Sequence, residues 1–356
     1  DVERSRGLGD VYKRQGMVLV KLKKIVRCGA MAALLALSMV VVAGCQQQHA
    51  VEDPDTKLMQ DAVDSGKEPV NSIDTPFYVL IVGNDARTGT TEASSEMYAD
   101  GKGRSDTMML VRIDPKTYQV SLVTIPRDTE TTIDGGVAKI NEAYHVGGID
   151  MAIDQVESLT GVHVQYYLDM GFVDFENFVN ALGGVTANVP IDMHLKDIVN
   201  GGTIELNAGA QELDGPEALV LARVRKLYAV DIEACRQIQD RQLVEAGIKQ
   251  VAADPANAAA HLDALLGNAE TNWPKDELAA MVADFAANAD RIAFQSGTGP
   301  YVGDFMEEHD GLWMVPRDEG TWRKVIEVVE SGGDPTTVVA LSLIHISEPT
   351  RPLYIS

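Results

Sequence analysis

The sequence has few cysteines, few aromatic residues and few cations for its length. Of its 356 residues three are cysteine and 6% are aromatic, and 30 Lys and Arg stand against 53 Asp and Glu, for a net charge of −23. Three cysteines do not make a disulfide framework. The acidic balance lacks the basic footprint of a nucleic-acid-binding protein, so nucleic acid is not an expected partner. With 45% hydrophobic residues, the chain is neither disordered nor a protein of many membrane spans.

The two ends of the sequence read as opposite strands of one piece of DNA. Residues 5–15 (SRGLGDVYKRQ) can be encoded by a stretch whose reverse complement translates as LSLIHISEPTR, the sequence of residues 341–351. This match is typical of a sequencing adapter read at both ends of a fragment. We therefore expect residues 1–16 and 341–356 to be artefacts outside the fold, with the natural C-terminus missing. The alternative is two genuine termini.

A signal peptide is expected over residues 17–44. Basic residues come first, the apolar run 30–42 follows, and the segment ends in VAGC at Cys45. The run is short for a membrane span, and small residues before a cysteine are similar to a bacterial lipobox. We expect Cys45 to be lipidated and to anchor the protein through its N-terminal lipid on the outer face of the cytoplasmic membrane. An ordinary signal peptide or an uncleaved anchor is the alternative.

Residues 45–340 are more acidic than the whole chain. They hold 21 basic and 49 acidic residues, a net charge of −28, and Cys235 is their one thiol if Cys45 carries lipid. Residues 45–75 are polar and without periodicity, which is typical of a linker. The folded domain is expected over residues 76–340.

Strand and helix patterns alternate along this domain. Residues 77–82 form a near-continuous apolar run, which is typical of a strand buried on both faces. The turn sequence DPKT joins two further strand patterns, 108–113 and 120–125, into a predicted hairpin. Helices are predicted over 149–159, 172–182, 216–224, 232–252, 255–267, 276–288 and 321–330, and short strands over 166–170, 185–191, 291–294 and 311–315. We predict one α/β domain, a central mixed β-sheet flanked by helices.

Arginines and aspartates recur at the ends of the predicted strands. Asp85 and Arg87 follow the first strand, Arg104 and Asp106 open the second, and Arg127 closes the third. Adjacent strand ends can bring these side chains to one edge of a sheet. Paired carboxylates suit Mg²⁺ held together with substrate phosphates, and arginine forks match phosphate oxygens. The pattern indicates a pyrophosphate bound with a metal, and surface salt bridging is the alternative.

Seven motifs in a fixed order resemble those of the LytR–CpsA–Psr cell-wall phosphotransferases. They are LIVGNDAR at 80–87, RSDTMMLVRID at 104–114, SLVTIPRDT at 121–129, KIN at 139–141, ALGGV at 181–185, LDGPEAL at 213–219 and LARVR at 221–225. The resemblance covers about residues 77–330. It implies an extracytoplasmic, Mg²⁺-dependent enzyme that transfers a glycopolymer, teichoic-acid-like or capsular, from a polyprenyl-pyrophosphate carrier to peptidoglycan by forming a phosphodiester.

The same resemblance implies roles for individual residues. Asp85 and Asp106 would hold Mg²⁺, and Arg87, Arg104 and Arg127 would act beside them on the phosphates. Asp85 could also accept the proton of the acceptor hydroxyl, although metal ligation alone explains this residue equally well. A further group would bind the pyrophosphate: Arg112, Arg223, Arg225, Asp231, Arg236, Arg241 and Gln242.

One stretch departs from the family's pattern. The family usually places an Arg three residues after an Asp, and Arg-Gln three residues further on, whereas Asp231, Arg236 and Arg241 here stand five apart. Five residues of helix turn by about 500°, so the two arginines differ in direction by roughly 140°. They are not expected to reach one phosphate together from an undistorted helix. This departure favours the alternative of a surface protein that binds polyprenyl phosphate or envelope glycans without turning them over.

Two further alternatives concern the lipid and the acceptor. Phe172, Phe175 and Phe178 share a helical face that could line an apolar slot for the polyprenyl chain, although residues at this spacing are more often ordinary core. The same chemistry on a protein acceptor, in place of peptidoglycan, is a second enzymatic possibility.

Overall fold

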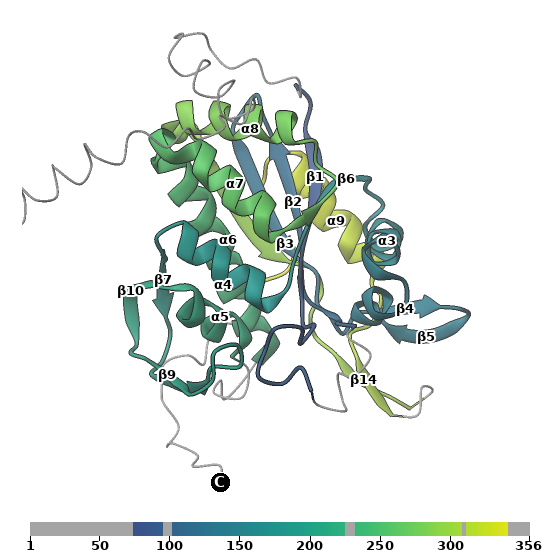
Figure 1. The fold of residues 1–356 in the computed structure, drawn as a ribbon. Coiled ribbons are helices and arrows are strands. Elements are labelled where there is room, and N and C mark those ends of the chain that lie inside the picture. Colours follow the sequence, from purple (N-terminus) through teal and green to yellow (C-terminus); the bar gives the residue numbers. More distant parts are fainter. Residues whose placement is uncertain (1–73, 95–101, 225–231, 308–310, 341–356) are drawn as a thin grey trace, which may run out of the picture. The chain divides into compact units, whose positions relative to one another are not determined.

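The computed structural model describes residues 74–94, 102–224, 232–307 and 311–340, with residues 232–235 described by their backbone alone. At the centre of this part lies a six-stranded sheet in the order β11-β6-β1-β2-β3-β12 (Figure 1). Its strands are β1 (Phe77–Asn84), β2 (Ser105–Asp114), β3 (Gln119–Thr124), β6 (Val164–Met170), β11 (Glu270–Thr271) and β12 (Ala293–Thr298). The prediction of a mixed sheet flanked by helices is confirmed.

The sheet is built around an antiparallel core. β2 pairs antiparallel with β1 on one side and with β3 on the other. β6 and β12 are parallel to their neighbours β1 and β3, because helices connect them to the rest of the chain. The predicted hairpin between β2 and β3 is confirmed, with Tyr118 at a positive φ of 58° just before β3 begins.

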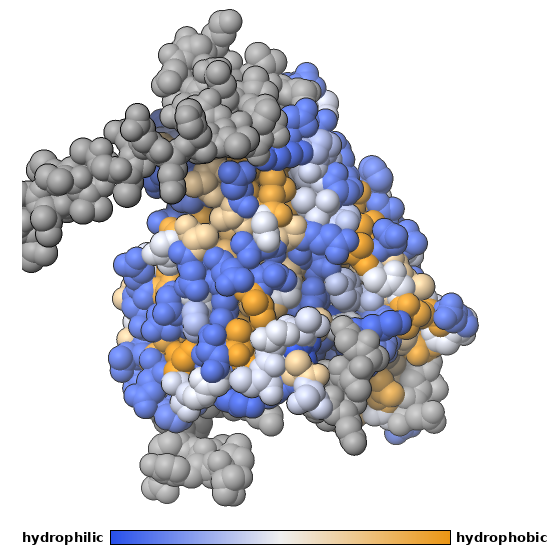
Figure 2. All heavy atoms as spheres, in the orientation of Figure 1, coloured by the Kyte–Doolittle hydropathy of each residue, from blue (hydrophilic) through white to orange (hydrophobic). Residues whose placement is uncertain are grey.

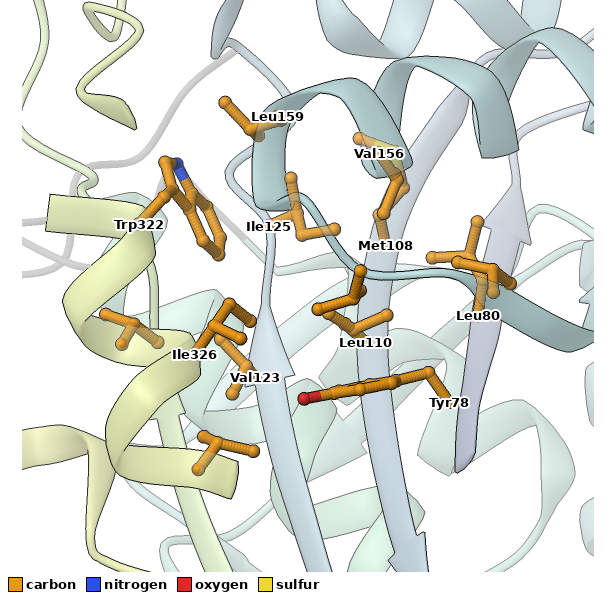
Figure 3. Close-up of a cluster of buried hydrophobic side chains, with 14 of the residues drawn as sticks. Tyr78, Leu80, Met108, Leu110, Val123, Ile125, Val156, Leu159, Trp322 and Ile326 are labelled. Carbon is orange, nitrogen blue, oxygen red and sulfur yellow. The ribbon is translucent and has the colours of Figure 1, made fainter. Parts of the chain in front are cut away.

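Alternating residues of the strands supply two separate hydrophobic cores. On one face, Leu80, Leu110 and Val123 pack against Val156 of α3 (Ile140–Thr160) and Trp322 of α9 (Glu319–Glu330) (Figure 3). The other face packs against α6 (Ile232–Ala253), α7 (Ala258–Asn268) and α8 (Lys275–Ala287). Successive strand side chains point to opposite faces, and both faces are covered by helices. The central strands therefore read as continuous apolar runs.

A third hydrophobic cluster shares α6 with the sheet: Leu243 and Ala246 belong to it, whereas Val244 and Ile248 pack on the sheet side. It is formed with α4 (Phe172–Ala181), α5 (Gly215–Arg223) and four short strands. These strands are β7 (Val185–Val189), β8 (Met193–Lys196), β9 (Thr203–Leu206) and β10 (Gly209–Leu213), paired as β7 with β10 and β8 with β9. A capping box at Asp214 and Glu217 starts α5, as the LDGPEAL motif predicted for a helix opening there.

The sequence patterns missed several short elements. β4 (Glu130–Ile133) and β5 (Gly136–Lys139) form an unpredicted hairpin a few residues after β3, and β13 (Asp304–Met306) was missed as well, whereas its partner β14 (Leu312–Met314) matches the strand predicted over residues 311–315. α3 begins at Ile140 and not at residue 149, and it contains a non-helical residue, Gly148, with φ of 69°. The predicted helix matches only the part after this kink, because the earlier turns are stabilised by tertiary burial of residues such as Ala143.

The described surface is mostly polar. On the face seen in Figure 2, hydrophilic residues predominate and apolar residues gather in separate patches. Within the described ranges, we find no helix that combines the length and the apolar character needed to cross a membrane.

Candidate functional site

Two strand ends meet at the edge of the sheet where β1 ends and β2 begins. The backbone N–H of Asp85, directly after β1, donates a 3.0 Å hydrogen bond to the carbonyl oxygen of Arg104. The N–H of Arg104 donates in turn to Oδ1 of Asp85 at 2.7 Å. This reciprocal pair fixes the Asp85 carboxylate at the edge of the sheet.

Asp106 occupies an irregularity in the pairing of β1 with β2. Gly83 faces Thr107, and the next residue, Asn84, faces Ser105, so the register skips Asp106. An extra residue on one strand bends that strand and re-aims its side chain, and such bulges are common beside active sites. Asp106 stands two residues after Arg104 in the sequence. It therefore lies at the same edge of the sheet as Asp85.

A line of alternating charges supports Asp106. Nη1 of Arg127 donates to Oδ1 of Asp106 at 2.8 Å, and Nε of Arg127 lies 3.4 Å from Asp128. The ammonium of Lys139 lies 2.7 Å from the other oxygen of Asp128, which is buried. Asp128 and Lys139 therefore hold Arg127 against Asp106. Neither Asp128 nor Lys139 was predicted to have a role, although Asp128 lies in the SLVTIPRDT motif and Lys139 in the KIN motif.

Glu142 is a third residue that the sequence did not indicate. Its carboxylate, on the first turn of α3, accepts hydrogen bonds from Nε of Arg104 at 2.7 Å and from Nη2 at 3.4 Å. These bonds raise the pKa of Arg104, and the nearby charge of Asp85 adds to the effect. The only available signal was an acidic residue directly after the KIN motif.

A buried polar network lies beneath Asp85. Nδ2 of Asn84 donates to Asp169 at 2.8 Å, and the hydroxyl of Tyr144 donates to the other oxygen of Asp169. The side-chain oxygen of Asn84 accepts from the N–H of Ala86 at 3.2 Å, which closes a turn around Asp85. Burial raises the pKa of Asp169, and burial also raises the pKa of Tyr144. The network holds the turn that carries the candidate metal ligand.

Arg87 and Arg223 come together on one aromatic ring. The Cζ atoms of both guanidinium groups lie 4.9 Å from the ring centre of Phe172. Nε of Arg87 also lies 3.6 Å from the carboxylate of Glu92. Phe172 belongs to none of the three hydrophobic clusters, so the interpretation of it as ordinary core is corrected, while a role in lining a slot for the polyprenyl chain stays a prediction. Phe175 and Phe178 do pack in the third hydrophobic cluster.

Arg236 and Arg241 lie on the part of α6 that packs against the sheet, with exposed fractions of 3% and 4%. Nη1 of Arg236 donates to Thr107 at 3.1 Å and to Asp240 at 3.2 Å. Nη1 of Arg241 donates to Thr124 at 2.8 Å, and burial lowers the pKa of Arg241 to about 10. Both arginines face the sheet, and the two heads contact different strands, β2 and β3. Gln242, the next residue, is half-buried.

Arg112 does not belong to this site. It stands six residues after Asp106 on β2, so the two lie about 20 Å apart along the strand. Its neighbour across the sheet is Tyr78, at the start of β1, and its guanidinium lies 3.7 Å from Asp114. The structure does not bring Arg112 together with the other predicted residues, because a strand residue six positions further on lies at the opposite end of the sheet.

Three predicted residues fall outside the described part of the chain. They are Cys45, Arg225 and Asp231. The five strand-end residues, in contrast, are all described. The structure places these residues at one end of the sheet as two hydrogen-bonded pairs, Asp85 with Arg104 and Asp106 with Arg127, while Arg87 stands on the Phe172 ring.

The donor set at this edge fits a hard divalent cation. Mg²⁺ is usually bound through one or two carboxylates together with substrate phosphates, and Asp85 and Asp106 offer two carboxylates beside arginines that suit phosphate. Across the described residues, no group of three or more His, Cys, Asp or Glu side chains is placed to hold a metal by itself. The residues present fit an ion that a phosphate ligand would complete.

Comparison with known proteins gives the family. A sequence model of the LytR_cpsA_psr family matches residues 40–326. The polyisoprenyl-teichoic acid–peptidoglycan teichoic acid transferase TagU of Bacillus mycoides is 31% identical over 265 residues, 73% of this chain and 78% of that protein. TagU of Halalkalibacterium halodurans is 33% identical over 232 residues, 64% and 71%. The crystal structure of B. subtilis TagV matches with a TM-score of 0.59 at 26% identity, covering 72% of this chain and 97% of that one. The chain therefore belongs to the LytR–CpsA–Psr family.

Proposed function

We propose that this protein transfers a glycopolymer of the teichoic-acid class from a polyprenyl-pyrophosphate carrier to peptidoglycan, with Mg²⁺ at Asp85 and Asp106. The observation that carries the proposal is that two carboxylates stand at the same sheet edge, each held by an arginine: Arg104 fixes Asp85 and Arg127 binds Asp106. The names of the TagU relatives support the substrate class, because they describe transfer of teichoic acid from a polyisoprenyl carrier to peptidoglycan.

The residues divide the chemical work between them. An acceptor hydroxyl oxygen attacks the phosphorus that carries the glycan, the bond from that phosphorus to the bridging oxygen breaks, and polyprenyl phosphate leaves. Asp85, whose carboxylate accepts a hydrogen bond from the N–H of Arg104, would accept the proton of the hydroxyl unless its role is metal ligation alone. Arg127 and Arg104 offset the negative charge on the reacting phosphoryl group. Mg²⁺, when bound, would offset the charge of the pyrophosphate oxygens.

A transfer assay with a radiolabelled glycan on a polyprenyl-pyrophosphate carrier tests this function. With peptidoglycan as acceptor, we expect label on the peptidoglycan and release of polyprenyl phosphate, both abolished by a chelator and restored by Mg²⁺. If the label appeared on an added protein and not on peptidoglycan, the acceptor would be a protein. Tight carrier binding without release of polyprenyl phosphate would support the non-enzymatic alternative, which the changed spacing around Arg236 favours.

We also propose that Cys45 is lipidated and holds the protein on the outer face of the cytoplasmic membrane. The supporting observation is the VAGC sequence after an apolar run too short for a comfortable membrane span. In a bacterial host that lipidates exported proteins, Cys45→Ser is expected to move the protein from the membrane fraction to the soluble extracytoplasmic fraction. Unchanged membrane retention of this variant would show that the segment is an uncleaved anchor.

A further inference from the structure

Phe172 stands where three separate elements of the fold converge. It is the first residue of α4, and it follows β6 after the single residue Gly171. Arg87 reaches it from the loop after β1, and Arg223 from the last residue of α5. Each Cζ atom lies 4.9 Å from the centre of its ring, which is inside the range of about 6 Å for a cation–π contact.

We propose that Phe172 is a positioning residue that holds Arg87 and Arg223 as a pair for the two phosphates of one pyrophosphate. This role rests on the proposed function, because it concerns how two arginines that would bind the pyrophosphate carrier are held in place. A single ring that contacts both guanidinium groups sets the spacing between them before any ligand arrives. A preorganised pair loses less side-chain freedom on binding than two independent arginines.

The chemistry of an aromatic ring suits this task better than a carboxylate does. A carboxylate holds arginine through its N–H groups, which are the groups that phosphate uses. A ring attracts the flat face of the guanidinium by its quadrupole and takes up none of those N–H donors. Phe172 can therefore orient both arginines without competing with a phosphate for the same hydrogen bonds.

The charges around the ring point to an anionic ligand. Glu92 is one nearby counter-ion: its carboxylate lies 3.6 Å from Nε of Arg87 and 2.9 Å from the ammonium of Lys196. The hydrogen bond from Lys196 lowers the pKa of Glu92, and the charges of Arg87 and Arg223 lower it further. Three cations thus act on this one carboxylate in a chain with a net charge of −23. The positive charges gathered around the ring would attract the negative charge of a pyrophosphate.

The test measures the binding of two small probes in the presence of Mg²⁺: farnesyl pyrophosphate and farnesyl monophosphate. Phe172→Leu keeps an apolar side chain but removes the ring. We expect it to raise the Kd for the pyrophosphate by about tenfold, to change the Kd for the monophosphate much less, and so to abolish most of the preference for pyrophosphate. Phe172→Tyr retains the ring and should retain the preference.

Two controls separate positioning from general damage. Phe175→Leu changes a residue of the same helix that packs in the third hydrophobic cluster, and it should leave both Kd values unchanged. In an Arg223→Gln background, adding Phe172→Leu should weaken pyrophosphate binding by much less than in the wild type, because one member of the pair is already lost.

Several outcomes would overturn the proposal. An equal loss for both probes, or the same loss with and without Arg223, would mean that Phe172 only supports the fold. A wild-type protein that binds neither probe would refute the arginine pair together with the carrier site. A wild type that binds the pyrophosphate probe but never transfers glycan would refute the proposed function alone, and the Kd comparison would still decide the role of Phe172.

Discussion

Asp106→Asn is expected to lower glycopolymer transfer by at least about 100-fold, the size of loss that follows removal of one preorganised electrostatic group from an active site. Asparagine keeps the size of the side chain and an oxygen that can accept the 2.8 Å hydrogen bond from Arg127. The substitution therefore removes the negative charge of the side chain and keeps its hydrogen bond to Arg127. Asp85→Asn has the same logic, since its oxygen can still accept from the N–H of Arg104 at 2.7 Å. The measurement is the initial rate of polyprenyl phosphate release at saturating Mg²⁺.

A control variant at an exposed aspartate and a measurement of stability show whether the loss of rate is specific to the site. Asp290→Asn changes an exposed aspartate in the short turn after α8, and it should leave the rate unchanged. The urea midpoints of all three variants should stay close to the wild-type value, because the hydrogen bonds that Arg127 and Arg104 donate to the two side chains are both kept. If Asp106→Asn and Asp85→Asn both retained more than about a third of the wild-type rate, the two-carboxylate metal assignment would be wrong.

Trp322→Ala is expected to have the largest effect on stability, about 3–5 kcal/mol of the free energy of unfolding. Trp322 is 0% exposed and packs α9 onto the face of the sheet that also carries Met108, Val123 and Ile125 (Figure 3). The fit is close: a Cβ atom added to Gly299 would lie 1.9 Å from the indole ring. The backbone of Gly299 therefore lies directly against the ring, and a backbone segment held in place fills the space that alanine leaves less readily than a side chain would.

Urea unfolding followed by circular dichroism measures this loss. Phe305→Ala is the matched control, because Phe305 is also aromatic but is 68% exposed on β13. It should change the free energy of unfolding by no more than about 0.5 kcal/mol. A loss below about 1.5 kcal/mol for Trp322→Ala would show that the packing of α9 on the sheet contributes less than its burial indicates.

The strand-end residues could be predicted because their signal is local. The apolar runs at 77–82 and 108–113 indicate where β1 and β2 lie, and the turn chemistry between the second and third runs indicates a hairpin. These two facts bring Asp85, Arg104, Asp106 and Arg127 to one edge. Strand spacing alone also separates Arg112 from these residues, because it stands six residues after Asp106 on the same strand.

The supporting residues could not be predicted, because their partners are distant in the sequence. Glu142 meets Arg104 across 38 residues, and Tyr144 and Asn84 meet on Asp169. Phe172 has the helical spacing of a core residue, and only the packing of α4 beside α5 and the loop after β1 turns it toward two arginines. Hydrophobic periodicity indicates which face of a helix is apolar, but it does not indicate which residues pack on the first turn of the helix.

By itself, the sequence determined the order of the elements, the mixed sheet buried on both faces and the recurrence of aspartate and arginine at strand ends. These follow from periodicity and from local turn chemistry, which act between residues close along the chain. The tertiary structure alone decided the bulge that aims Asp106, the line from Lys139 through Asp128 and Arg127, and the shared ring under Arg87 and Arg223. Those contacts depend on the register of paired strands and on the seating of helices, which are set only when segments far apart in the chain pack together.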